Sequence, residues 1–160
     1  MVSAIELTEK QEYNLAFLDS VNNETVLDRI CFRHLTVSAL HYCTTILLNR
    51  ILEPNIRTDE ESQSAAREIC KITRQLRRAG FLRTPQSLVW PLPLFIAGIE
   101  TTDSIYQEWI LAYMEEIDDW GPNMKTMRLL FCKIIQRQER EDRRVKVRDV
   151  MEDFDLRVLL

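Results

Sequence analysis

The chain has 160 residues, a mass of 19.0 kDa and 46% hydrophobic residues, enough for one domain with its own core and no disulfide or metal staple. Its three glycines and five prolines are too few for most sandwiches, barrels or glycine-rich phosphate loops, and they exclude collagen-like and disordered chains. A net charge of −4 disfavours a free-standing DNA-binding domain, which is usually basic. We predict one all-α domain over residues 1–160, an irregular bundle of about six or seven helices without a sheet.

The first half of the chain predicts three helices, over residues 4–20, 25–52 and 60–79. Asp59 is a suitable N-cap for the third helix, because its carboxylate can accept hydrogen bonds from the first backbone N–H groups. Gly80 ends that helix at the position where a left-handed residue is favoured. The connections are short, so no domain boundary is expected here.

The helix at 25–52 is apolar on many sides, so we expect several neighbours to bury it. Cys31, His34 and His41 share one of its faces, a spacing that suits a thiol–imidazole pair or part of a metal site. A zinc site, however, needs three or four ligands from more than one element, and no others are signalled. We therefore interpret the two histidines as buried, hydrogen-bonded core residues.

The second half of the chain predicts four helices. Proline is favoured only in the first turn of a helix, so Pro91 marks the start of the first one. Gly121 followed by Pro122 gives the corresponding start of the third. The four helices are predicted over residues 91–99, 103–118, 122–142 and 147–154.

Charge is sorted into blocks along the sequence. Residues 67–83 hold six basic residues and one acid, whereas residues 84–124 hold seven acids and no Lys or Arg. Such blocks indicate complementary faces that pack on each other or on a partner, and the alternative is ordinary solvated helix faces. The basic stretch that follows, at 137–148, is interleaved with acids, so we interpret it as an ion-paired, solvated helix end.

The four cysteines, at positions 31, 43, 70 and 132, include no C-x2-C pair and predict reduced, mostly buried thiols. The start of the sequence shows no signal peptide. The uncharged stretch from His34 to Asn49 is shorter than the roughly 17–25 residues of a membrane span. We therefore expect neither a membrane association nor a bound cofactor.

Two chemical hypotheses rest on single clusters. Asp118 and Asp119, in an acidic run at a helix end, suggest a metal-dependent helical enzyme, but no second acidic cluster faces them. Tryptophan and phenylalanine side chains suggest a cavity for a small apolar ligand, although aromatic residues at helical spacing are more often core. The aromatic residues concerned are Trp90, Phe95, Trp109, Trp120 and Phe131.

The segment 88–152 carries tryptophan, proline and glycine positions in a distinctive order. These positions and their apolar neighbours are Trp90, Pro91, Leu92, Phe95, Ile96, Ala97, Gly98, Trp109, Ile110, Trp120, Gly121, Asn123, Arg144, Val145, Val147, Val150 and Met151. The set closely resembles the C-terminal part of the fungal-specific transcription-factor domain, the regulatory region behind the zinc-cluster DNA-binding module of fungal regulators. Within it, Gly98 is expected to allow close approach of another helix.

The resemblance implies a non-catalytic regulatory domain in the nucleus, which contacts protein co-regulators or the rest of a longer regulator and accepts a small effector in some cases. The six-cysteine zinc cluster is missing from this sequence, so direct DNA binding is not expected. We expect a fragment of a longer regulator, an incomplete gene model, or a relative kept for protein contacts. If the family region extends upstream, the helix at 25–52 exposes apolar surface that otherwise meets further helices. A stand-alone ligand-sensing module is the alternative function.

Overall fold

The computed structural model describes residues 29–56, 59–82 and 91–155. These residues form six α-helices and one 3-10 turn and contain no strand, which confirms the all-α prediction. The predicted helix at 4–20 and Trp90 lie outside the described residues. The elements are α2 (Arg29–Leu52), α3 (Glu60–Arg78), α4 (Pro91–Glu100), α5 (Ser104–Glu116), η1 (Asp118–Trp120), α6 (Pro122–Glu141) and α7 (Val147–Asp153).

The helix ends follow the local signals in the sequence. The Asp59 carboxylate caps α3 by accepting hydrogen bonds from the backbone N–H groups of Glu61 and Ser62. At the other end of α3, Gly80 has φ 83°, the left-handed conformation that glycine adopts without steric cost. Asp103 caps α5 in the same way as Asp59 caps α3. The largest difference from the predicted ranges of α3 to α7 is at α5, which ends at Glu116, where the chain continues into η1, and the other ends of these helices differ by at most one residue.

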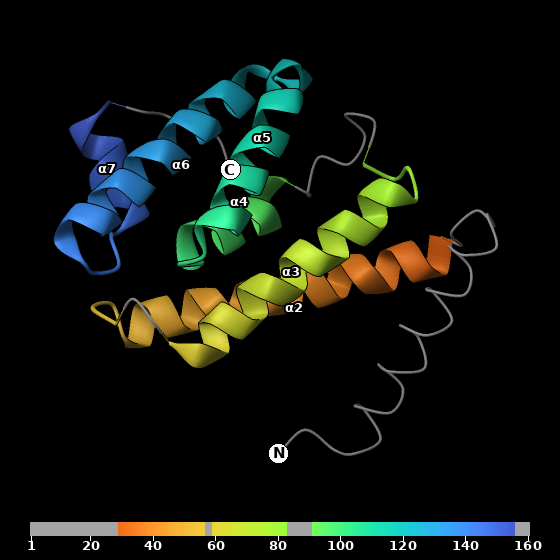
Figure 1. Ribbon diagram of the computed structural model, residues 1–160, viewed down its shortest axis with the longest axis horizontal. Helices are drawn as coiled ribbons and strands as arrows, with labels where there is room; N and C mark the ends of the chain where they lie inside the picture. The colour runs from red at the N-terminus through yellow and green to blue at the C-terminus, as the bar shows by residue number, and fades with distance from the viewer. Residues whose placement is uncertain (1–28, 57–58, 83–90, 156–160) are drawn as a thin grey trace.

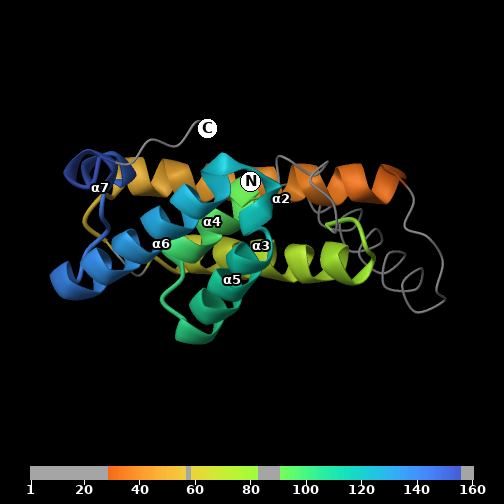
Figure 2. The same ribbon diagram turned by 90° about the horizontal axis from the view of Figure 1, so that it is seen from above.

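Helices α2 and α3 run antiparallel, side by side, along the length of the molecule (Figure 1). Helices α5, α6 and α7 lie on one side of this pair. The short helix α4 contacts α2 and α3 on one side and α5 and α6 on the other. Figure 2 shows the same arrangement from above, with α4 among the other helices. The central position of α4 explains why nine of its ten residues are buried.

The core around α4 is tightly packed. The rings of Phe95 on α4 and Phe131 on α6 meet edge to face, with centroids 6.4 Å apart. Gly98 lies against the same phenylalanine: a Cβ at this position would lie 3.0 Å from Phe131 Cζ, closer still to Cε2, and 3.2 Å from Ile110 Cγ2. A side chain at position 98 therefore has no room, and the close approach expected from the sequence is present.

One buried cluster of charges ties distant parts of the fold together. The Glu100 carboxylate, at the end of α4, accepts hydrogen bonds from Arg50 Nη1 at 2.8 Å and from Arg144 Nη2 at 2.5 Å. Arg144 also donates to the backbone carbonyls of Asn49 and Glu53 at the end of α2. We call Arg50, Glu100 and Arg144 the Glu100 cluster. The basic stretch 137–148 was predicted to be a solvated helix end, and this prediction is wrong at Arg144, which is buried.

Candidate functional site

Helix α2 has an apolar face that no described helix covers. Six of its large hydrophobic side chains are exposed, with Val37 at 64% and Ile51 at 74% of full exposure. The six residues are Val37, Leu40, Leu47, Leu48, Ile51 and Leu52. Their spacing of three and four residues puts them on one side of the helix, opposite the buried Leu35, Ala39, Cys43 and Ile46. We call these six residues the α2 face.

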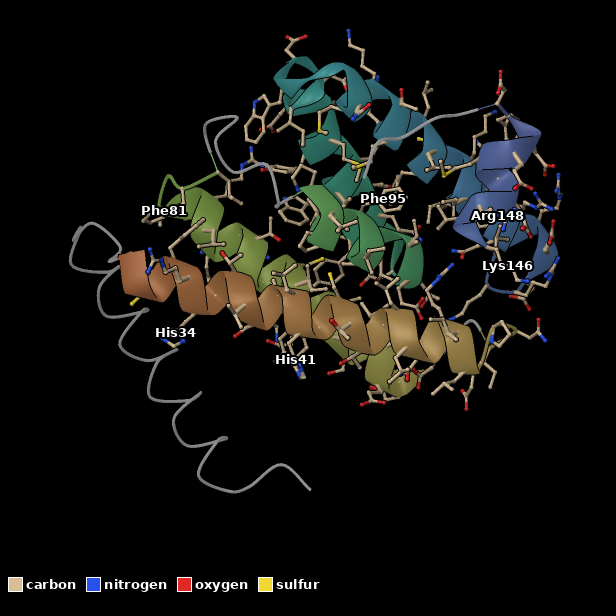
Figure 3. The ribbon with its side chains drawn as sticks, turned by 180° about the vertical axis from the view of Figure 1, so that it is seen from behind. His34, His41, Phe81, Phe95, Lys146 and Arg148 are labelled. Atoms are coloured by element: carbon tan, nitrogen blue, oxygen red, sulfur yellow. The ribbon has the colours of Figure 1, made fainter. Side chains whose placement is uncertain are left out.

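The histidines of α2 belong to this outer side of the helix. His34 and His41 are both exposed, so the prediction that they are buried core residues is wrong. Figure 3 shows both side chains projecting from α2, away from α4, α5 and α6. The prediction of a fully buried helix is wrong for the same reason: α3 and α4 cover only one side of α2.

A pocket of about 590 Å³ lies where the C-terminal ends of α3 and α5 meet η1. Helix α3 and the residues after it contribute Arg74, Arg77, Arg78 and Leu82. Helix α5, the residue after it and η1 contribute Trp109, Tyr113, Glu116, Ile117 and Trp120. Because Arg74, Arg78 and Glu116 are exposed, this polar side of the pocket opens to solvent.

Charged and aromatic groups inside the pocket hold one another in place. Arg77 Nη2 donates to both carboxylate oxygens of Glu116, at 2.7 and 2.6 Å, which joins α3 to α5. The Arg77 guanidinium also lies 5.3 Å from the ring centroid of Tyr113. Burial raises the pKa of the Tyr113 hydroxyl to about 12, so this group is a protonated donor at neutral pH. The Arg77–Glu116 pair is one contact between the basic and acidic blocks, and both of its side chains remain partly exposed, as solvated helix faces would be.

The described residues singled out from the sequence lie in three places: the core, the pocket and the start of α6. Pro91, Phe95 and Gly98 lie in α4 and are buried in the core, and they do not line the pocket described above. Trp109 and Trp120, 11 positions apart in the chain, both line the pocket. Sequence reasoning missed the pocket arginines as partners of these rings, since their only signal was the basic block at 67–83. Gly121 is the extended N-cap residue of α6, and a Cβ there would meet nothing within 4 Å.

The remaining candidate groups are accounted for by their neighbours. The Asp118 carboxylate accepts hydrogen bonds from Arg128 Nε at 3.1 Å and Nη2 at 2.9 Å. Within residues 29–56, 59–82 and 91–155, no three His, Cys, Asp or Glu side chains are grouped to hold a metal ion. The four cysteines are free thiols, and burial raises the pKa of Cys43 and Cys70 to about 12. None of the described helices is long and apolar enough to cross a membrane.

Comparison with known sequences gives one family. The sequence model of the fungal specific transcription factor domain matches residues 5–160, nearly the whole chain. No curated protein and no solved structure gives a significant match. The match extends well beyond the segment 88–152 that carries the resemblance, and it includes α2, α3 and the pocket.

Proposed function

The chain belongs to the fungal specific transcription factor domain family, and from this membership we propose that it is the regulatory, protein-interaction part of a fungal transcription regulator. A role in transcription regulation follows from the family itself. The finer proposal is that residues 1–160 act as one regulatory domain in the nucleus, without catalysis. They contact a protein co-regulator or the rest of a longer regulator, and they do not contact DNA directly.

The single observation that carries the proposal is the α2 face. Soluble monomeric proteins seldom expose large contiguous apolar patches, and those that exist are commonly interaction sites. Apolar side chains at three- and four-residue spacing are the pattern by which a helix is recognised by a partner helix or groove. The six residues of the α2 face have this spacing over four turns of one helix. A protein surface is therefore the partner that best fits them.

Charge supports the absence of direct DNA contact. The chain has a net charge of −4, and both of its basic blocks, at 67–83 and 137–148, are partly used by internal ion pairs such as Arg77–Glu116 and Arg144–Glu100. Non-specific DNA affinity comes mainly from Lys and Arg that neutralise phosphates. Because acids outnumber bases and many bases pair with acids, the chain is better suited to act on transcription through other proteins.

The test is a tethering experiment. The full chain is fused to an unrelated DNA-binding domain in a fungal cell, and expression of a reporter gene with the matching site is measured. We expect the fusion to raise or lower expression relative to the DNA-binding domain alone. Leu48→Glu with Ile51→Glu should abolish the effect, because two charges would then lie in the α2 face.

The matched control is Ile105→Glu, an equally exposed isoleucine on α5, which should leave reporter expression unchanged. Circular dichroism of the purified variants should show unaltered helix content, since all three side chains are already exposed. If the tethered chain leaves reporter expression unchanged, the regulatory proposal is wrong. If the Leu48→Glu/Ile51→Glu variant and the Ile105→Glu control change reporter expression equally, the α2 face has no special role.

A further inference from the structure

We propose that the pocket between α3, α5 and η1 binds a small organic anion that carries a planar aromatic group. The pocket volume of about 590 Å³ lies within the roughly 300–1,000 Å³ of sites for small molecules. The inference depends on the pocket residues and not on the α2 face, so it stands or falls independently of the proposed protein partner.

The preference for an anion comes from Arg74 and Arg78. Both line the pocket, and they lie one turn apart on α3, where two like charges repel. Neither forms an ion pair with a carboxylate of the described chain, in contrast to Arg77, which Glu116 neutralises. A carboxylate in the pocket would relieve this repulsion and form charge-assisted hydrogen bonds with the planar guanidinium groups.

Capping of α3 does not account for these arginines. Lys and Arg in a last helical turn commonly serve the unpaired backbone carbonyls and the negative end of the helix dipole. In α3, the backbone N–H groups of Ala79, Gly80 and Phe81 already donate to carbonyls of the last turn, at 3.0 Å each. The Arg74 and Arg78 guanidinium groups are therefore not needed for hydrogen bonding at this helix end.

The preference for an aromatic group comes from the other wall. The rings of Trp109 and Tyr113 are nearly parallel, with an interplanar angle of 25° and centroids 6.4 Å apart, and Trp120 lines the pocket from η1. Flat apolar rings favour a flat apolar ligand through stacking. Tyr113 is only 2% exposed, whereas Trp109 and Trp120 are half-buried, so these two tryptophans present the ring surface of this wall. The wall thus offers aromatic ring surface to a ligand in the pocket.

Two probes with the same ring and opposite charge test the proposal. Indole-3-acetate and tryptamine are each titrated into the full chain by isothermal titration calorimetry. We expect saturable one-to-one binding of indole-3-acetate and much weaker binding of tryptamine. Higher salt should weaken the binding of indole-3-acetate, because exposed guanidinium groups are screened. Equal affinity for the two probes, or no saturable binding of indole-3-acetate, would overturn the proposal.

Substitutions in the pocket locate the binding. Arg74→Gln with Arg78→Gln removes both charges and should weaken indole-3-acetate binding about tenfold or more, as expected for loss of hydrogen bonds to a charged group. The matched control is Arg67→Gln, on the same helix but outside the pocket, which should bind like the unmodified chain. Circular dichroism verifies that all variants are folded. If the double variant also binds like the unmodified chain, the site lies elsewhere and the proposal is wrong.

Discussion

Replacing Glu100 with glutamine would remove one negative charge from the Glu100 cluster without changing the shape of the side chain. Glu100 is 2% exposed, and its carboxylate accepts from Arg50 on α2 and from Arg144 between α6 and α7. In the variant, two largely buried guanidinium groups would face a neutral amide. The nearest other carboxylate oxygen is on Asp59, 3.8 Å from Arg144 Nη2.

Breaking a buried ion pair by removing one partner costs about 3–5 kcal/mol, because the remaining charge stays buried without compensation. For a chain of this length, each kcal/mol lowers Tm by about 2–4 °C, so Glu100→Gln should lower Tm by about 6–20 °C. The free energy of unfolding is measured by urea denaturation and Tm by thermal denaturation, both followed by circular dichroism. Because the pair is buried, the loss should persist at 0.5 M salt, a condition of roughly 4 Å screening length.

The matched control is Glu60→Gln, since Glu60 pairs with Arg67 on the surface and its side chain is 90% exposed. Exposed pairs contribute about 0–1 kcal/mol, so this variant should unfold nearly like the unmodified chain. Combining Glu100→Gln with Arg144→Met should cost less than the sum of the two single changes, because both remove the same contact. A loss below about 1 kcal/mol for Glu100→Gln, or additive losses in the double variant, would refute the stabilising role of the cluster.

Three further results are expected. Gly98→Leu should destabilise the fold by about 1–3 kcal/mol or more in urea denaturation, because the new side chain would occupy the space of Phe131, and an unchanged transition would contradict this packing. In the folded chain, a thiol reagent at pH 8 should modify the half-buried Cys31 and Cys132 first. It should reach Cys43 and Cys70 only after unfolding, as a time course of modification would show. Burial raises the pKa of Cys43 and Cys70 from 9.0, and of Tyr113 from 10.0, to about 12. As the pH rises, the unfolded chain therefore releases these protons before the folded chain does. The free energy of unfolding should be constant just below pH 9 and fall as the pH rises toward 12, and an unchanged free energy over this range would contradict the burial of these groups.

Helix ends were predictable because their signals are local. Asp59, Gly80 and Asp103 lie within a few residues of the backbone groups that they serve, so the sequence alone marks these positions. The 3-10 turn after α5 was not expected, since the acidic run there resembles the continuation of a helix. The predicted ranges of the described helices otherwise agree with the structure to within a few residues.

The side of α2 that is covered could not be predicted in the same way. Apolar residues surround much of this helix, so its pattern distinguishes no single inward face, and His34 and His41 were assigned to the wrong side. The deciding factor is where α3 and α4 pack, which depends on the whole fold. A local pattern identified the helix, and only the tertiary contacts identified its exposed face.

The Glu100 cluster was missed for a related reason. Arg50, Glu100 and Arg144 are at least 44 positions apart, and no spacing rule connects them. Charged residues are also rarely buried, so composition argued for the surface at each position. The pocket was not predicted as such: a ligand cavity was only the alternative to core for the aromatic residues, and of these Trp109 and Trp120 line the pocket together with arginines.

The central place of α4 has a consequence for how the protein unfolds. This helix contacts α2, α3, α5 and α6, so neither the α2–α3 pair nor the α5–α7 group can separate without exposing it to water. Without both groups, α4 would be a ten-residue apolar helix, too short to persist alone. Local opening should therefore spare α4, whose amide hydrogens should exchange with solvent only when the whole described core unfolds in one cooperative step.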